Sequence, residues 1–194
     1  MPQTLLHFPP TQARTAPQSA PCPIFSRSLG GNLLRHMRLL DIDKTAALVA
    51  RAMNPDEGQY ARKTFEHHFA CQHHGIDDGR TLFVLTRGSE VLGIVGLHSQ
   101  PWGPPENVWL SWFAVDPLLQ GRGLGSAILD AVTREARHRH FMKFYIETYS
   151  TPEFARARAF YRARGFRPVG KVDSYLPDGG SMVVYYKPLT SQTE

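Results

Sequence analysis

The chain contains very little cysteine and no long apolar run. Only Cys22 and Cys71 are cysteines among its 194 residues, which is too few, and too far apart, for the disulfide framework of a small secreted domain. No apolar run approaches the roughly 18 to 20 residues that a membrane-spanning helix needs. We therefore expect a soluble protein of a reducing compartment, located in the cytoplasm.

Acidic residues are absent from the first forty positions. Prolines crowd the same stretch, which shows no sustained helical or strand period, and they stand at Pro2, Pro9, Pro10, Pro17, Pro21 and Pro23. So many prolines argue against the amphipathic helix of a transit peptide. We expect residues 1–36 to form a flexible tail, residues 37–190 the folded domain and residues 191–194 a short C-terminal tail. A natural start at Met37 stays an open alternative.

The charge balance is modestly basic. Lys and Arg number 22 against 17 Asp and Glu, a formal net charge of +5. This surplus suits a ligand with several phosphates, but it also suits nucleic acid or an anionic surface. Much of it lies in residues 134–143 and 156–164, and such runs are usually solvated faces. The sign of the charge alone decides little between these ligands. We expect neither a nucleic acid nor a membrane as partner.

Hydrophobic periodicity predicts alternating strands and helices in one domain. Two helices are expected before residue 75, and the apolar run Trp109–Val115 is expected to be the central strand. The other expected strands are a short one near residue 38 and segments 81–86, 91–97, 144–148, 169–172 and 182–186, with further helices after residues 124 and 150. This order predicts an α+β fold with a mixed, mostly antiparallel sheet packed by helices.

A glycine-rich turn, Gln120-Gly-Arg-Gly-Leu-Gly125, separates the central strand from the next helix. Glycines leave backbone N–H groups accessible, and the helix N-terminus carries partial positive charge, so this turn predicts a phosphate site. A P-loop is excluded because no Gly-Lys-Ser or Gly-Lys-Thr occurs. The dinucleotide fingerprint fits poorly, since its third position falls on Ser126 and no early βαβ unit precedes it.

The spacing of Gln120, Gly123 and Gly125, with Arg122 between them, resembles the acyl-CoA pyrophosphate loop of the GNAT superfamily of N-acyltransferases. The phrase Phe113-Ala-Val-Asp-Pro117 is similar to that family's central strand, and Ala159-Phe-Tyr-Arg-Ala-Arg-Gly-Phe166 to its last helix. The resemblance covers roughly residues 38–189. It implies a single GNAT-like domain whose sheet has six to seven strands, carries helices on both faces and is split between the central strand and the next.

This resemblance implies transfer of an acetyl group from acetyl-CoA, as co-substrate, to a primary amine by direct attack in a ternary complex. The backbone N–H of Phe113, Ala114 or Val115 would polarise the thioester carbonyl and pair with the pantetheine arm. The residues expected around the pyrophosphate are Gln120, Gly121, Arg122, Gly123, Gly125 and Ser126. Arg122 would add a charge that backbone dipoles lack, although an exposed cation on a turn is an equally simple interpretation.

The resemblance also suggests the catalytic groups. Tyr161 matches the family's helix tyrosine, and a phenol can give its proton to a departing thiolate. Glu147 matches the base of ribosomal-protein N-terminal acetyltransferases, whereas other branches place the base where this chain has Trp109, which cannot accept a proton. Glu106 is near enough in sequence to substitute through water. Ordinary core packing for Tyr161, and structural hydrogen bonds for the two glutamates, stay open.

Other interpretations compete with this one. The absence of an acid at position 109 keeps open a regulatory module that binds acyl-CoA without transferring it. A metal site at His67, Cys71 and His74 is disfavoured because no CxxC pair or HExxH motif accompanies it, so no metal is expected. The acceptor pocket is expected to use the second helix, residues 100–105 and residues 174–180. The amine itself, a small molecule or a peptide, is not specified, and a homodimer stays open.

Overall fold

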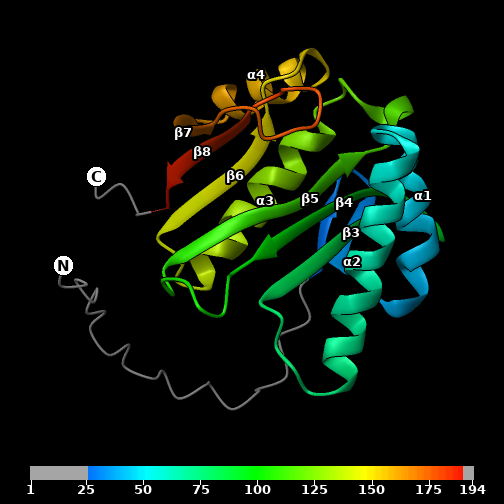
Figure 1. Cartoon of the computed structure of the whole chain (residues 1–194). Coiled ribbons are helices and arrows are strands. Elements are labelled where there is room, and N and C mark those ends of the chain that lie inside the picture. Colours follow the sequence, from blue (N-terminus) through cyan, green and yellow to red (C-terminus); the bar gives the residue numbers. More distant parts are fainter. Residues whose placement is uncertain (1–25, 190–194) are drawn as a thin grey trace, which may run out of the picture.

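A computed structural model describes residues 26–189 of the chain. Its centre is one eight-stranded sheet with the order β1-β2-β3-β4-β5-β6-β8-β7 (Figure 1). The strands are β1 (Ser26–Leu29), β2 (Asn32–His36), β3 (Arg80–Arg87), β4 (Glu90–His98), β5 (Asn107–Val115), β6 (Lys143–Tyr149), β7 (Arg167–Val172) and β8 (Met182–Pro188). Only β5 and β6 are parallel; every other neighbouring pair is antiparallel. The predicted α+β class with a mixed sheet is confirmed.

The N-terminal edge of the sheet differs from the prediction. Residues 26–36, which we assigned to the tail, form the hairpin β1–β2, and β2 pairs with β3. Gly30 and Gly31 both adopt positive φ, +56° and +80°, as the tight turn of a two-residue hairpin requires, and Leu34 is buried. The folded region therefore begins before Met37, and the sheet gains an eighth strand. Residues 1–25 and 190–194, which hold the rest of the predicted tails, lie outside the described residues.

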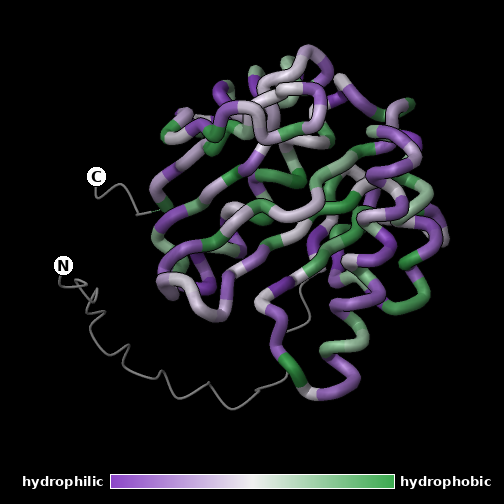
Figure 2. The backbone as a smooth tube through the Cα atoms, viewed as in Figure 1, coloured by the Kyte–Doolittle hydropathy of each residue, from purple (hydrophilic) through white to green (hydrophobic). Residues whose placement is uncertain are grey.

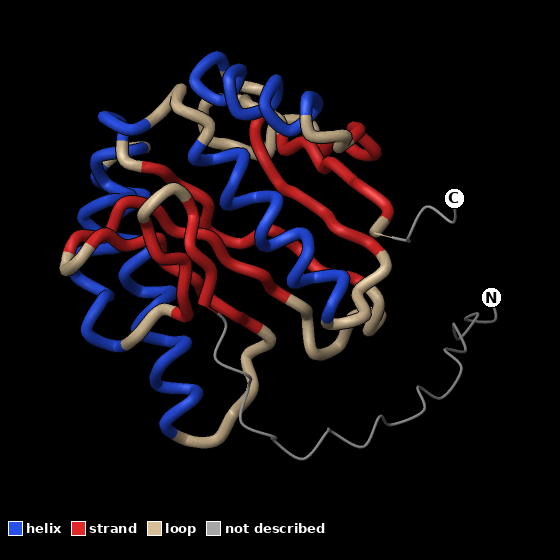
Figure 3. The backbone as a smooth tube through the Cα atoms, turned by 180° about the vertical axis from the view of Figure 1, so that it is seen from behind, coloured by secondary structure: helices blue, strands red, loops and turns tan. Residues whose placement is uncertain are grey.

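Helices cover both faces of the sheet. They are α1 (Ile42–Ala52), α2 (Pro55–His73), α3 (Leu124–His138) and α4 (Ala155–Ala163). Figures 1 and 3, seen from opposite sides, show α1 and α2 on one face and α3 crossing the other. Strand β3 is buried on both faces: Leu82 and Val84 pack in the cluster of α1 and α2, whereas Phe83 and Leu85 pack in the cluster of α3. None of the helices within residues 26–189 has the length and apolarity to cross a bilayer.

Hydropathy follows this layering. Figure 2 shows hydrophobic residues concentrated along the central strands and hydrophilic residues on the outer turns of the helices. Amphipathic helices with one apolar stripe produce this pattern when they pack on a sheet. The central strands β3, β4 and β5 are therefore packed between two apolar layers.

The sheet splits between β5 and β6. Their parallel pairing covers only three residue pairs, from Asn107 with Lys143 to Trp109 with Tyr145. Beyond this point β5 continues along β4 through an irregularity in register between Val95 and Leu97, while β6 continues along β8. Gly96 permits the irregularity, because a Cβ there would lie 2.9 Å from the Cβ of Ser111. The predicted split is confirmed, and one edge of β5 is left without a neighbouring strand.

Candidate active site

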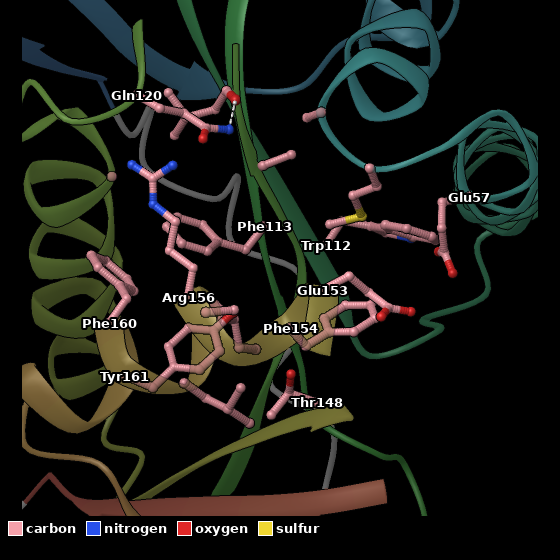
Figure 4. Close-up of a pocket in the computed structure, with 18 of the residues that line it drawn as sticks. Glu57, Trp112, Phe113, Gln120, Thr148, Glu153, Phe154, Arg156, Phe160 and Tyr161 are labelled. Atoms are coloured by element: carbon pink, nitrogen blue, oxygen red, sulfur yellow. Dashed lines mark hydrogen bonds between the residues drawn. The ribbon is translucent and has the colours of Figure 1, made fainter. Parts of the chain in front are cut away.

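A cavity of about 900 Å³ occupies the split between β5 and β6 (Figure 4). Residues 110–115 of β5 and 146–149 of β6 form two of its walls. The glycine-rich turn and the start of α3 lie at one end, and the residues around the start of α2 contribute to the rim. Residues 153–161, which include most of α4, close the remaining side. Strands that diverge in this way leave main-chain N–H and C=O groups free to pair with a ligand.

The glycine-rich turn is shaped for an anion. Gly121 and Gly123 have φ of +77° and +79°, a region that favours glycine, and a Cβ at either position would meet only open space. Gly123 is the N-cap of α3, and no side chain caps this helix, so its first N–H groups have no partner within the helix. The Gln120 amide donates to the Val115 carbonyl at 3.1 Å (Figure 4). This bond fixes the turn to the end of β5.

Almost all the predicted cofactor residues line this cavity. Those present in its walls are Phe113, Ala114, Val115, Gln120, Gly121, Gly123, Gly125 and Ser126. Arg122 is not among the lining residues, which favours its interpretation as an exposed cation on a turn. A different arginine approaches this end, because the Arg164 guanidinium donates to the Ser126 hydroxyl. The structure therefore brings together the main-chain part of the predicted site.

Tyr161 lies in the wall of the cavity, on α4 (Figure 4). Its side chain is only 7% exposed and packs against the rings of Phe113 and Phe166, with centroids 6.5 and 6.3 Å away. Within residues 26–189 its hydroxyl has no hydrogen-bond partner. Burial raises the pKa of this phenol well above its ordinary value. Tyr161 therefore stays protonated at neutral pH and presents an unused O–H donor beside the cavity.

Glu147 also lines the cavity, from β6. Its neighbours Ile146 and Thr148 are buried, whereas Glu147 is exposed, so the carboxylate points to the opposite face of the strand. The Tyr149 hydroxyl donates to it at 3.3 Å. Burial, followed by the charge of Glu147, raises the pKa of Tyr149 to about 12. The structure thus places a phenol and a carboxylate along the same cavity but on different faces of the sheet.

Glu106 lies elsewhere. It immediately precedes β5, and the Lys143 ammonium donates to its carboxylate at 3.1 Å. This position is at the end where β5 and β6 are still paired, and Glu106 is not among the residues that line the cavity. Trp109 stacks on Tyr145 with ring centroids 4.9 Å apart. Neither residue supplies a carboxylate to the site, so Glu147 is the one predicted base that the structure brings to it.

Sequence reasoning did not single out three charged residues that line the cavity: Glu57, Glu153 and Arg156. Glu57 stands in the first turn of α2, and burial, with a smaller contribution from Asp56, raises its carboxyl pKa. This position agrees with the expectation that the second helix contributes to the acceptor pocket. The segment 100–105 does not line the cavity, and Tyr175 reaches it only indirectly, by stacking on Tyr149 with centroids 6.1 Å apart.

The histidine-rich end of α2 forms polar pairs. The Cys71 thiol lies 3.5 Å from His67 Nε2, while the buried His68 pairs through Nδ1 with Asp78 at 2.8 Å. In the part of the chain that the structure describes, no three His, Cys, Asp or Glu side chains converge as metal ligands would.

Comparison with known proteins identifies the family. The family described as acetyltransferase (GNAT) family matches residues 35–166, and the chain belongs to this family. The match includes the glycine-rich turn, Glu147 and Tyr161. No curated protein sequence matches the chain.

Solved structures share the fold. A GNAT-family protein from Desulfovibrio desulfuricans has a TM-score of 0.74 at 21% identity, covering 82% of this chain and 99% of its own. The Escherichia coli ribosomal-protein-S18-alanine N-acetyltransferase gives 0.67 at 22% identity, with 84% and 97% covered. An aminoglycoside 6'-N-acetyltransferase complexed with coenzyme A gives 0.66 at 12% identity, with 83% and 99% covered. The chain thus spans nearly the whole length of each.

Proposed function

We propose that this protein is an N-acetyltransferase that moves an acetyl group from acetyl-CoA to a primary amine in a ternary complex. One observation carries the proposal: a single cavity joins the uncapped N-terminus of α3 to a buried phenol and an exposed carboxylate. Phosphate binding at one end and proton transfer at the other are the two tasks of acetyl transfer from a CoA thioester. We further propose a cytoplasmic location, consistent with the low cysteine content.

The proposed cofactor site fits acetyl-CoA. The N–H groups at the start of α3, with Gly121 and Gly123 in left-handed conformations, suit a diphosphate. The free edge of β5 at Phe113–Val115 suits the amide-bearing pantetheine arm, which can pair with it as an added strand does. A backbone N–H of this segment would then donate to the thioester carbonyl and stabilise its oxyanion.

Glu147 is the proposed base. It takes a proton from the amine, whose nitrogen attacks the thioester carbon and forms the new C–N bond. Its exposure on the face of β6 away from Ile146 and Thr148 gives a water-soluble amine access without crossing the apolar layer of α4. No covalent intermediate on the protein is required, because the amine attacks the thioester directly in the proposed ternary complex.

Tyr161 is the proposed acid. When the C–S bond breaks, the sulfur leaves as a thiolate, and the phenol gives it the proton that neutralises it. The burial that raises the pKa of Tyr161 also disfavours a bare thiolate at the same place. The proton transfer therefore stays energetically accessible even though the phenol is a weak acid.

The structural neighbours support an amine acceptor in general terms. Their names describe transfer to a ribosomal-protein alanine and to an aminoglycoside, and both are amines. A regulatory module that binds acyl-CoA without transfer is the second candidate, favoured by the absence of an acid at Trp109.

Two measurements decide between the candidates. Calorimetry with CoA and acetyl-CoA tests the cofactor site, and thiol release with a panel of amines tests transfer. The proposal expects binding of CoA, thiol release that depends on the amine, and an acetylated product by mass spectrometry. Binding without release from any amine would favour the regulatory module, and absence of binding to well-folded protein would refute both.

A further inference from the structure

Charged side chains of opposite sign lie toward opposite ends of the cavity. Figure 4 shows the Arg156 guanidinium directed toward Gln120 and α3, whereas the carboxylates of Glu57 and Glu153 lie on the opposite side, near α2. Glu147 lines the same cavity from β6. The cation thus faces the end proposed for the cofactor phosphates, and the three carboxylates surround the part left for the acceptor.

These three carboxylates have no cationic partner within residues 26–189. Three other glutamates in the described chain do have one: Glu106 pairs with Lys143, Glu135 with Arg139 and Glu66 with Arg62. A single carboxylate is sufficient as the base for amine attack. Three unpaired carboxylates around one cavity therefore exceed what the chemical step requires.

Tyr149 lies near two of these carboxylates, Glu147 and Glu57, and its hydroxyl donates to Glu147 at 3.3 Å. The charges of Glu147 and Glu57 both contribute, after burial, to raising the pKa of the Tyr149 phenol, so both lie within electrostatic reach of its hydroxyl. The ring of Phe154 meets the ring of Tyr149 edge-on, with centroids 5.1 Å apart at 78°. Both rings line the cavity. Aromatic faces beside carboxylates attract and hold an ammonium group.

A second observation points independently to a ligand in this cavity. Tyr161 is more than nine-tenths buried in its wall, and its hydroxyl has no hydrogen-bond partner among the described residues. The hydroxyl oxygen is not fully enclosed by protein, so it opens to the cavity, where a ligand can accept its hydrogen bond. The carboxylates therefore border a binding cavity rather than a stretch of solvated surface.

We propose, building on the proposed function, that the acceptor is an amine with a second ammonium group. Glu147 takes the proton of the reacting nitrogen, while Glu57 and Glu153 hold the second ammonium beside the rings of Tyr149 and Phe154. This chemistry is present in free diamines and polyamines, and also in a peptide N-terminus followed by a basic residue. A neutral or acidic group at the second position would leave Glu57 and Glu153 without a positive charge to pair with.

The test compares ligands that differ only at the second group. The first set is 1,4-diaminobutane, butylamine and 4-aminobutyrate, and the second is alanyl-lysine amide and alanyl-norleucine amide. Binding to the full chain is measured by calorimetry in the presence of CoA, and turnover by thiol release. The variants are Glu57→Gln, Glu153→Gln and both together. Glu66→Gln, on α2 but outside the cavity, is the control that makes the same change in net charge.

We expect the dicationic member to bind more tightly in at least one set. Each substitution in the cavity should reduce its advantage over the neutral member by about two- to fivefold, and the double substitution by about tenfold, with no change for Glu66→Gln. The decisive quantity is the change that each substitution makes in the ratio of the two affinities, dicationic over neutral. The ratio alone is not decisive, because the free amines also differ in their own pKa values. The set that responds tells whether the acceptor is a free polyamine or a peptide.

An unchanged ratio in the double variant, or tighter binding of the neutral or acidic ligand, would overturn the inference. Failure of the proposed function gives a different result. Selective binding of dicationic ligands without thiol release from any amine would refute acetyl transfer while supporting the site for a dicationic amine. Thiol release with equal preference for neutral and dicationic amines would do the reverse.

Discussion

Tyr161→Phe should separate catalysis from stability. The substitution removes one oxygen and leaves the ring contacts with Phe113 and Phe166 in place. Loss of a general acid reduces kcat by roughly 10² to 10⁴, which corresponds to about 3 to 5 kcal/mol of activation free energy. Because the hydroxyl makes no hydrogen bond within the described residues and opens to the cavity, its removal should not lower the free energy of unfolding.

Tyr185→Phe is the matched control. Tyr185 is fully buried, its hydroxyl is also without a hydrogen-bond partner, and its ring centroid lies 6.3 Å from that of Tyr161. It does not line the cavity. Removal of an unsatisfied buried hydroxyl should stabilise the protein by about 1 kcal/mol, or raise Tm by about 2 to 4 °C. Its kcat should stay within a factor of two of the unsubstituted protein.

The assay is thiol release at saturating acetyl-CoA and amine, with CoA affinity measured separately by calorimetry. Both variants should bind CoA as the unsubstituted protein does, and only Tyr161→Phe should lose turnover. The assignment of Tyr161 as the acid would be refuted by an unchanged kcat. A large loss of Tm in Tyr161→Phe would refute the claim that its hydroxyl is free.

Three further predictions concern the cofactor turn, the base and the fold. Gly123→Ala places an L side chain at φ +79°, so it should weaken CoA binding, measured by calorimetry, at least fivefold. The control is Gly88→Ala, at φ +56° in open space outside the cavity. It should cost similar stability, about 1 kcal/mol, and leave CoA affinity unchanged. Glu147→Gln should lower kcat/KM about 10² to 10⁴-fold at pH 7, with a smaller deficit at high pH because more of the amine is neutral; a deficit that grows with pH in a pH–rate profile would contradict this role. Burial disfavours the charge of Asp41, but two hydrogen bonds from Arg35, at 2.7 and 2.9 Å, and one from the Arg38 backbone N–H outweigh this effect. Together they hold the Asp41 pKa below its ordinary value. Asp41→Asn should therefore lower the free energy of unfolding by about 1 to 3 kcal/mol at pH 7. That difference should shrink as pH falls below about 4 and through the lower folded-state pKa, and denaturant titrations that give equal losses at pH 7 and pH 3 would contradict it.

Local sequence signals predicted the parts of the site that depend on main-chain conformation. The glycine-rich segment forms the predicted turn between the central strand and the helix, with positive φ at Gly121 and Gly123, and Tyr161 lies in the cavity wall as the helix phrase implied. Both features are encoded within a few consecutive residues. The missed hairpin was also encoded locally, by Gly30-Gly31, but the acid-free, proline-rich context obscured it.

The remaining features arise from contacts between distant segments. Glu57 reaches the cavity because α2 packs closely on α1, and a Cβ at Gly58 would lie only 2.6 Å from the Ala50 Cβ. A glycine inside a helix costs about 1 kcal/mol relative to alanine, so Gly58 was a usable signal of close helix contact. The irregularity opposite Gly96 depends on the register of β4 against β5, which no periodicity within one strand reveals.

The early end of the β5–β6 pairing has a consequence for redesign. In the proposed complex the donor substrate contacts main-chain groups of β5, which are the same whatever side chains β5 carries. The proposed acceptor contacts carboxylates and rings from α2, β6 and the segment before α4. Exchanging those acceptor-side residues leaves the hydrogen-bonding edge of the strand intact. A repertoire of new acceptors should therefore be reachable from this scaffold by altering a handful of side chains, with the thioester still seated in its original position.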